Sequence, residues 1–366
     1  MAITLDGTLG ITTPTYGGAT SAEYSVPVTG FKNRIINGAM VIDQRNAGAS
    51  VTIPATSVVY TLDRWYGYGS QASKFSIQQN AGSVTPPAGF TNYIGCASLS
   101  AYSIGSGDEF DLGTRIEGFN ASDLAWGTAN ASTVTLSFKV YSSLTGTFGG
   151  SLRNASFNRA YPFSFTVTTA NTWTTISITI AGDTSGTWGT GNGIGIIINF
   201  SLGTGSTLSG TAGSWQAGAF TSATGATSVV GTSGATFYIT GVQLEKGSTA
   251  TSFDYRPYGT ELQLCQRYYQ LVSSFTGSGN STTQIAAVAP FQTPMRATPT
   301  SGAQGVLNVS DGTGDFVQSA AAANLLTADA NSIILLLPNF TSITANRIYL
   351  GYRLSNTNKI TLSAEL

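Results

Sequence analysis

The sequence predicts an all-β protein: an antiparallel jelly-roll sandwich with an extended amino-terminal arm and a second, smaller carboxyl-terminal β domain. Apolar and polar residues alternate in many short runs, turns rich in Gly, Ser and Thr separate these runs, and helical periodicity is almost absent. Such runs are typical of sandwiches, because each strand buries one face against a second sheet. The 366 residues exceed the usual size of a single domain, about 100 to 200 residues. Two domains and an arm are therefore expected.

Residues 1–30 are rich in Gly, Thr and Pro, and their apolar residues are too sparse to close a core. A segment of this composition does not bury enough apolar surface to fold alone. We expect residues 1–30 to form an extended arm that becomes ordered against a partner or a neighbouring copy.

Residues 31–258 carry the pattern of the sandwich. Three runs alternate strictly and predict strands with one buried face: Val134–Val140, Phe163–Val167 and Ile176–Ile180. A fourth run, Ile194–Leu202, is also apolar at Ile197, between the alternating positions, and is expected to be buried on both sides. The alternation slips by one residue at Gly241, which predicts a β-bulge in the strand that closes the sandwich.

One helix is predicted, within a junction at residues 259–271. Thr260 and Gln263 have the spacing of a capping box, in which two side chains satisfy free backbone N–H groups at the start of a helix. Beyond the junction, residues 272–366 predict a small β domain. Its strands are expected at Ile285–Phe291, Ile333–Leu337, Ile348–Leu354 and Ile360–Leu366.

The composition excludes several functions. The chain has no histidine, which removes Ser-His-Asp and Cys-His catalysis and the usual zinc sites. Charged residues make up 9% of the chain, against about 25% in typical domains, and the formal net charge is -1. The cations lie singly rather than in clusters, so we expect no binding of nucleic acid.

The sequence also bears on the compartment. No apolar run approaches the roughly 18 residues of a membrane span, and residues 1–10 lack the pattern of a signal peptide. We therefore expect cytosolic synthesis without secretion and no insertion into a membrane. Cys96 and Cys265 are predicted to be packed free thiols, because two distant cysteines do not make a disulfide framework. No pattern requires a cofactor.

Carboxylates between residues 105 and 119 allow three interpretations. A glycosidase needs only two carboxylates, and Glu109 and Glu117, with the nearby Asp108, Asp111 and Asp123, could supply an acid and a base. The same cluster could hold a calcium ion, although its spacing is not that of an EF-hand. The favoured interpretation is structural: the carboxylates cap loop turns and meet Arg115.

The tryptophans are the candidate ligand-binding residues. Trp65 and Trp173 adjoin strand patterns and are expected in the core. Trp126, Trp188 and Trp215 lie beside Gly, Ser and Thr in predicted loops, where exposed indole rings could stack on sugar rings. We expect these three residues to contact a glycan.

Two blocks of the sequence resemble the opening and closing signatures of carbohydrate-binding-module-like sandwiches in bacteriophage tail fibres. The opening block is Asn33–Met40, Asp43–Arg45 and Leu62–Trp65, and the closing block is Val242–Gly247, Phe253, Tyr255–Gly259 and Leu264–Tyr269. The resemblance implies a phage virion protein, a tail fibre or receptor-binding subunit that adheres to glycans on the host surface. It also implies a homotrimer that attaches to other virion proteins through its arm, synthesised in the host cytoplasm and located in the virion.

Two other functions stay open: a head fibre or capsid decoration protein, and a polysaccharide depolymerase. In a chain so poor in charge, the charged signature residues are expected to be structural. Two ion networks are predicted among the signature residues, which also include Trp65: one of Arg45, Asp63 and Arg64 and one of Glu245 and Arg256. Because jelly rolls bring their ends together, the final strand, Val242–Glu245, is expected to pair near a first strand at Ile35–Ile42, so that the two blocks form a structural seam.

Overall fold

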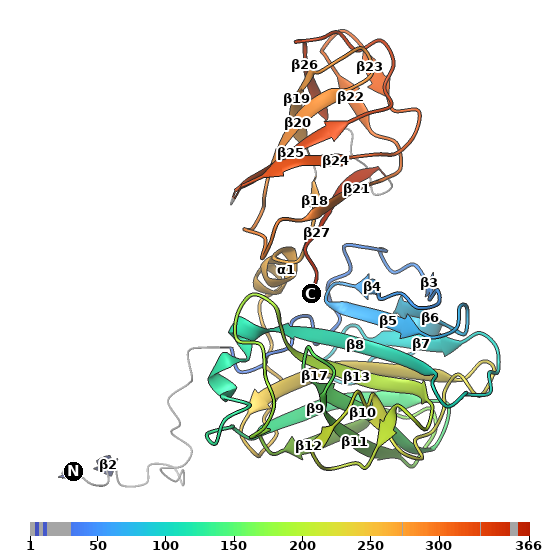
Figure 1. Cartoon of the computed structure of the whole chain (residues 1–366), viewed down its shortest axis with the longest axis vertical. Helices are drawn as coiled ribbons and strands as arrows, with labels where there is room; N and C mark the ends of the chain where they lie inside the picture. Colours follow the sequence, from blue (N-terminus) through green and yellow to red (C-terminus); the bar gives the residue numbers. More distant parts are fainter. Residues whose placement is uncertain (1–3, 7–9, 13–30, 273, 330, 352–357) are drawn as a thin grey trace.

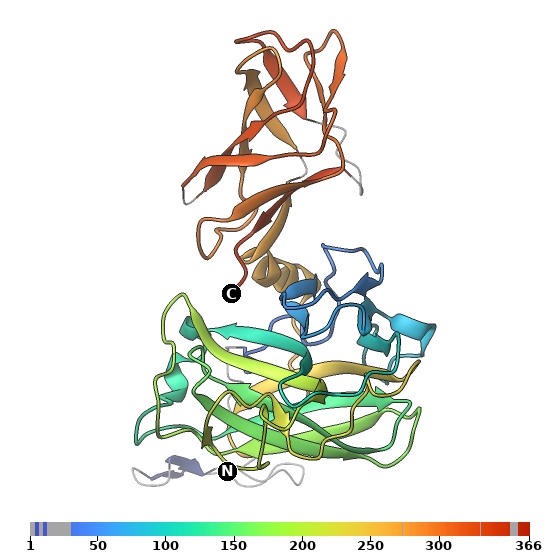
Figure 2. The same ribbon diagram turned by 45° about the vertical axis from the view of Figure 1, so that its right-hand side comes forward.

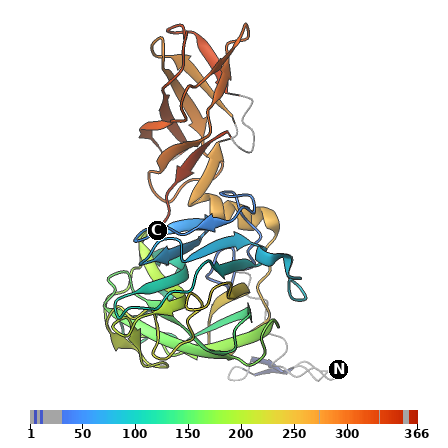
Figure 3. The same cartoon turned by 90° about the vertical axis from the view of Figure 1, so that its right-hand side faces the viewer.

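A computed structural model describes residues 4–6, 10–12, 31–272, 274–329, 331–351 and 358–366. The fold is all-β, an antiparallel jelly-roll sandwich with a second, smaller β domain, as predicted. The small domain stands on one end of the sandwich, and helix α1 (Tyr258–Gln266) lies between the two parts in all three views (Figure 1, Figure 2 and Figure 3). The last described residue lies at this junction rather than at the far tip of the small domain (Figure 3).

The sandwich consists of two antiparallel sheets. The front sheet has the order β15-β11-β10-β13-β8-β5-β4, and the back sheet has the order β12-β9-β17-β7-β6-β3. The front strands are β4 (Val59–Leu62), β5 (Trp65–Gly69), β8 (Glu109–Glu117), β10 (Gly146–Arg153), β11 (Arg159–Val167), β13 (Ile194–Thr204) and β15 (Gln216–Ala217). The back strands are β3 (Val51–Thr52), β6 (Phe75–Gln79), β7 (Ile94–Ser98), β9 (Val134–Ser142), β12 (Thr174–Ile180) and β17 (Thr236–Lys246).

Shorter elements complete the described part of the sandwich and the arm. Strands β14 (Ser209–Gly210) and β16 (Ser222–Ala223) form a small parallel pair in the long loop after β13. Single 3-10 turns lie at Ala81–Ser83, Gly118–Asn120 and Ser122–Leu124. In the arm, β1 (Thr4–Asp6) pairs antiparallel with β2 (Gly10–Thr12), and the remainder of the predicted arm lies outside the described residues.

Four strand predictions for the sandwich are confirmed. The three strictly alternating runs correspond to β9, β11 and β12, and β13 is buried on both sides, as its apolar run predicted. The predicted bulge lies in β17, where the register with β9 shifts between Thr240 and Gln243 and Gly241 has φ +61°. Aromatic residues from both sheets fill the core, among them Trp65 and Phe200 of the front sheet and Phe138 of the back sheet.

The small domain has two further sheets. The upper sheet has the order β23-β22-β26-β19-β20-β25-β24, and the lower sheet has the order β18-β27-β21. The upper strands are β19 (Phe275–Gly279), β20 (Ile285–Pro290), β22 (Asn308–Ser310), β23 (Asp315–Val317), β24 (Asn324–Ala328), β25 (Ser332–Leu337) and β26 (Ile348–Gly351). The lower strands are β18 (Tyr269–Val272), β21 (Thr300–Gln304) and β27 (Lys359–Ser363). The four strands predicted here are present as β20, β25, β26 and β27, although residues 352–354 of the third lie outside the described residues.

The predicted helix forms, but the predicted capping box is wrong. Helix α1 begins at Tyr258 after Pro257, and no side chain caps its first turn. Thr260 therefore lies inside the helix. Glu261, in the same turn, is buried and pairs with Arg256 at 3.2 Å. Tertiary contacts, rather than a local cap, thus determine where the helix begins.

The two signature blocks meet at a seam, as expected. The Val242 N–H donates to the Gly38 carbonyl and the Arg34 N–H donates to the Leu244 carbonyl, both at 2.9 Å. The first strand expected at Ile35–Ile42 is wrong, because these residues form turns that run along β17. Cys96 and Cys265 are buried free thiols, as predicted. Among the described residues, no helix has the length and apolar character needed to span a membrane.

Candidate functional site

A groove of about 430 Å³ opens on the outer face of the front sheet. Strands β5, β8, β10 and β13 form its floor, and the loops after β10 and β13 form its far wall. Its lining residues are Val58, Tyr66, Tyr68, Glu109, Asp111, Arg115, Arg153, Phe157, Asn199, Leu208 and Ala219.

Strand β8 contributes alternate residues to this groove. Phe110 and Leu112 point into the sandwich core and are fully buried, so Glu109, Asp111 and Arg115 face outward. Between the last two, Gly113 lies opposite Tyr66 of β5, and a Cβ atom at this position would come within 2.4 Å of the tyrosine ring. Glycine therefore allows the Tyr66 ring to lie flat across the floor of the groove.

Polar contacts join three neighbouring strands across the floor. The Tyr66 hydroxyl donates to Asn199 Oδ1 at 3.0 Å, and Asn199 Nδ2 donates to Asp111 Oδ2 at 3.0 Å. The register explains the contact, because Asn199 of β13 and Tyr66 of β5 both pair with Gly113 of β8. The side chains that face the groove are thus held by one another.

Several polar atoms around the floor have no hydrogen-bond partner within the described part of the chain. They are Asp111 Oδ1, Ser151 Oγ, Arg115 Nε and Arg153 Nε. Asp111 is only 1% exposed, and a buried carboxylate oxygen without a donor is unfavourable. These atoms are buried beneath the groove surface, so the layer under its floor is polar rather than apolar.

The groove contains acidic and basic side chains in equal number. Burial raises the pKa of Asp111 well above its ordinary value, and the nearby Glu109 raises it further. Burial also raises the pKa of Glu109, while Arg153 opposes both shifts. The guanidinium of Arg153 lies 5.0 Å from the centre of the Phe157 ring, and that of Arg115 lies 5.0 Å from the centre of the Tyr66 ring. Two carboxyl groups and two guanidinium groups therefore face the same cavity.

The structure separates the carboxylates that the sequence grouped together. Glu109 and Glu117 lie at opposite ends of β8, about 26 Å apart at roughly 3.3 Å per residue, whereas a glycosidase needs carboxylates within about 10 Å. Glu117 instead pairs with Arg267 at 2.7 Å. Asp123 pairs with Arg34 at 2.6 Å. The proposed acid and base pair of Glu109 and Glu117 is therefore wrong.

The structural interpretation holds for Asp108, which accepts hydrogen bonds from the Ser70 hydroxyl at 2.6 Å and the Gly105 N–H at 2.8 Å and so caps its loop. Arg115, however, does not meet these loop carboxylates. It contacts Tyr66 and the Leu366 carbonyl. Among the described residues, no three acidic or thiol side chains come together in a way that could hold a metal ion.

The three candidate tryptophans form one cluster on the sandwich, with ring centres 4.8 to 5.2 Å apart. Trp126 and Trp188 are only 7% and 8% exposed, and each indole N–H of the three donates to a backbone carbonyl. The expected exposure is therefore absent for Trp126 and Trp188, whereas Trp215 is partly buried. A glycan contact at Trp126, Trp188 and Trp215 stays a prediction.

Of the two tryptophans expected in the core, one is fully buried and one is partly buried. Trp65 is fully buried in the sandwich core. Trp173 is partly buried and packs against Tyr93 and Tyr141, with ring centres 5.5 Å apart.

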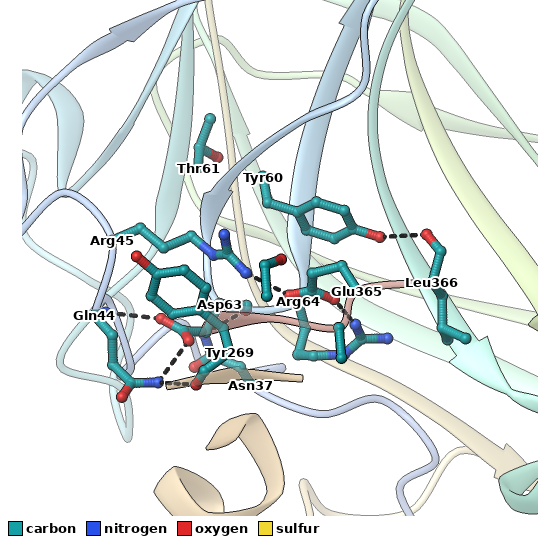
Figure 4. A network of polar contacts seen from close by, with 12 residues as sticks. Asn37, Gln44, Arg45, Tyr60, Thr61, Asp63, Arg64, Tyr269, Glu365 and Leu366 are labelled. Atoms are coloured by element: carbon teal, nitrogen blue, oxygen red, sulfur yellow. Dashed lines mark hydrogen bonds and ion pairs between the residues drawn. The ribbon is translucent and has the colours of Figure 1, made fainter. Parts of the chain in front are cut away.

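The charged signature residues lie at the seam and at the junction with the small domain. Arg45 and Arg64 belong to one buried network, as expected, but both pair with Glu365 rather than with Asp63 (Figure 4). Asp63 accepts from the backbone N–H and side-chain amide of Gln44 at 2.7 and 2.8 Å. Only the grouping of these residues, and not their pairing, was correctly predicted.

The second predicted network does not form as expected. Arg256 pairs with Glu261, and Glu245 accepts from the Thr251 N–H at 2.8 Å and the Thr251 hydroxyl at 2.7 Å. Thr251 follows β17 in a short turn, so Glu245 secures the end of that strand while Arg256 anchors helix α1.

Most residues of the groove were not predicted from the sequence. Tyr66 and Tyr68 follow Leu62–Trp65 and alternate with inward-facing residues. This alternation was the signal in the sequence that could have identified them as groove residues. Arg153 and Asn199 carry no such signal, because their strands become neighbours only through the sheet order. Phe157 lies in a turn, and the sequence does not show whether its side chain is exposed or belongs to the core.

No protein-family model and no curated protein matches this chain. Among solved structures, a putative sugar binding protein from Bacteroides thetaiotaomicron is 16% identical, with a TM-score of 0.33, over 59% of this chain and 100% of that one. A family 11 carbohydrate-binding module from Clostridium thermocellum, in complex with a β-1,3-1,4-mixed-linked tetrasaccharide, is 12% identical, with a TM-score of 0.29. This likeness covers 55% of the present chain and 98% of the module.

The enzymatically active domain of tailspike protein 4 from bacteriophage CBA120 is 11% identical, with a TM-score of 0.30. This likeness covers 59% of the present chain and 22% of the tailspike chain. At such low identities and TM-scores, none of these likenesses carries an argument about function.

Proposed function

We propose that this chain is an adhesion protein that binds a neutral glycan in the groove of the front sheet. The observation that carries the proposal is the lining of the groove, where polar side chains such as Arg115 lie beside the rings of Tyr68 and Phe157. Sugars combine hydroxyl groups, which donate and accept hydrogen bonds, with apolar ring faces, which pack on aromatic side chains. Because the groove holds two carboxyl and two guanidinium groups, a neutral sugar fits it better than a charged one.

We further propose that the protein is part of a phage virion, a tail fibre or receptor-binding subunit rather than a head fibre or capsid decoration protein. The two signature blocks and the composition of the arm support this proposal. In this role, glycan contacts that are weak in one copy become strong when several copies engage the host surface together. The arm, residues 1–30, would attach to other virion proteins.

We propose a homotrimer, and the upper sheet of the small domain offers a face on which copies could meet. Its outward rows cross four strands: Leu350, Thr276, Val288 and Ile334 in one row, and Ile348, Ser278, Ala286 and Leu336 in the next. No residue in these rows is charged, so two identical faces would not repel one another. Exposed apolar faces of this kind mark interaction surfaces in many proteins.

Calorimetric titration with neutral tetrasaccharides tests the glycan proposal. The panel contains β-1,4-glucan, mixed-linked β-1,3-1,4-glucan and β-1,4-galactan. Phe157→Ala should weaken binding about tenfold, because Phe157 is 44% exposed in the groove and its ring offers a stacking face. Phe119→Ala is the matched control, because Phe119 is 60% exposed but lies outside the groove.

Other outcomes of this titration would redirect the proposal. Equal affinity of the Phe157→Ala variant and the unaltered chain would remove the groove as the binding site. A loss that appears only with Trp215→Phe would assign binding to the tryptophan cluster. Release of reducing ends from the same sugars would favour the depolymerase alternative.

Immunogold labelling of virions with an antibody to this chain tests the location. Label on the tail is expected. Label on the head would favour the head fibre or decoration protein, and virions without label would contradict the virion assignment.

A further inference from the structure

The last residues of the chain return from the small domain to the sandwich. Glu365 follows β27, and its carboxylate pairs with Arg45 at 2.7 Å and also with Arg64. The two arginines come from the opening block, so one carboxylate joins the far end of the chain to the start of the sandwich. The close-up in Figure 4 shows Arg45 and Arg64 converging on Glu365.

The ion pairs of Glu365 with Arg45 and Arg64 are enclosed by the protein, and their geometry is restricted. All three side chains are nearly buried, with exposures of 12% for Arg45, 1% for Arg64 and 7% for Glu365. The guanidinium of Arg64 lies 3.6 Å from the centre of the Tyr268 ring, and that of Arg45 lies 3.8 Å from the centre of the Tyr269 ring. A buried charge that loses its partner is strongly destabilised, so these residues hold the tail in one position.

Arg296 of the small domain secures the same tail from the other side. Its Nε donates to the Ala364 carbonyl at 2.5 Å, and its Nη2 donates to the Glu365 carbonyl at 3.0 Å. Its Nη1 donates to the Asn192 carbonyl of the sandwich at 2.6 Å. The tail is therefore fixed to both parts of the molecule.

The secured tail reaches a residue of the groove. The Leu366 carbonyl accepts from the Tyr60 hydroxyl at 3.0 Å and from Arg115 Nη1. Within the described part of the chain, the Leu366 carbonyl is the hydrogen-bond acceptor of the Arg115 side chain, whose Nε has no partner. The other contact of the Arg115 guanidinium is the Tyr66 ring in the groove.

A continuous series of contacts thus runs from the tail into the groove floor: Leu366 to Arg115, Arg115 to Tyr66, Tyr66 to Asn199 and Asn199 to Asp111. We infer that the tail, residues 364–366, positions Arg115 for the ligand, so that the small domain determines the affinity of the sandwich groove. Glu365 is a positioning residue, because it holds the tail without lining the groove. The inference rests on the glycan-binding function proposed above.

The physical reason lies in the length of the arginine side chain. A free arginine occupies many rotamers, and binding a sugar hydroxyl would have to order it. With Nη1 held by Leu366, the planar guanidinium presents its remaining N–H groups in a fixed direction. Loss of this order should weaken glycan binding about three- to tenfold, as expected for one side chain immobilised on binding.

A double-mutant cycle tests the coupling. Calorimetry with the tetrasaccharide that binds most tightly in the panel compares Glu365→Gln in the unaltered background and in the Arg115→Met background. Glu365→Gln should weaken binding three- to tenfold in the first background and less than twofold in the second, because its effect passes through Arg115. An equal loss in both backgrounds, or no loss in the first, would overturn the inference.

A second measurement needs no ligand. In a chain labelled with ¹⁵N-arginine, the Nε–H order parameter of Arg115 should fall in Glu365→Gln and in the milder variant Tyr60→Phe, which removes the hydroxyl donor to Leu366. An unchanged order parameter would contradict the positioning role even if no tetrasaccharide binds. Failure of the glycan proposal alone would instead show as no binding by any variant, with the order parameter still reduced.

Discussion

Several of the few charged residues of this chain lie buried inside it. Glu365 holds two buried arginines, and Glu117 holds Arg267 where the sandwich meets helix α1. In a chain that is only 9% charged, each such pair specifies one arrangement of the parts rather than general solubility. The neutral surface that remains is suited to contacts with hydroxyl groups.

Asp63 gives a prediction at this scale. Burial raises its pKa from 3.8 to about 6, although Arg45 and the two hydrogen bonds from Gln44 oppose the shift. Because the folded pKa exceeds the unfolded one, the stability that this carboxyl contributes is present below about pH 4 and lost as the pH rises through about 6. The difference in unfolding free energy between Asp63→Asn and the unaltered chain should therefore move toward the variant by about 3 kcal/mol from pH 4 to pH 7.

Urea unfolding at pH 3, 4, 5, 6 and 7 measures this difference. Asp329→Asn is the control of opposite sign. The backbone N–H groups of Asn331 and Ser332 lower the pKa of Asp329, so its contribution is present at neutral pH and lost in acid. A pH-independent difference for Asp63→Asn would contradict the assignment of its raised pKa to burial.

At the scale of elements, the alternating pattern predicted the strands because alternation is a local property. Strands β9, β11, β12 and β13 follow directly from which side chains must be buried. The start of helix α1 was not predictable in this way. Glu261 and Arg256 meet the opening block there, and a contact with a segment more than 200 residues away leaves no local signal.

The bulge in β17 gives the prediction for an element. Gly241 has φ +61°, and an added Cβ would come within 2.6 Å of the Phe90 ring. Gly241→Ala should therefore lower the unfolding free energy by about 1 to 3 kcal/mol through backbone strain and overpacking. Thermal and urea unfolding measure the loss.

Gly234→Ala is the matched control for the bulge. Gly234 has a similar positive φ, +76°, but a Cβ there would meet nothing within 4 Å. Its loss should be smaller than that of Gly241→Ala. Equal losses would mean that the contact with Phe90 contributes nothing.

At the scale of the whole molecule, the exposed face of the upper sheet bears on the proposed homotrimer. Val288 lies at the centre of the uncharged rows, and it is exposed, so a substitution there should not disturb folding. Val288→Lys should reduce self-association at least tenfold, because it would place like charges opposite one another when copies meet. Sedimentation velocity from 5 to 500 µM measures this change.

Ser177→Lys is the control for self-association, because Ser177 is an exposed residue of the edge strand β12, far from the upper sheet in sequence and in the fold (Figure 1). It should leave the association unchanged. A trimer that persists in Val288→Lys would place the contact between copies elsewhere, and a monomer at all concentrations of the unaltered chain would contradict the homotrimer.

The sequence by itself determined the fold class, the positions of the strands with clear alternation, the bulge at Gly241 and the absence of imidazole chemistry, because each of these depends on residue type or on spacing within a few residues. Only the tertiary structure decided the groove and the junction. Asn199 meets Tyr66 across 133 residues, and Glu365 meets Arg45 across 320. Strand order and register bring such residues together, and no local pattern in the chain records which distant strand will become a neighbour.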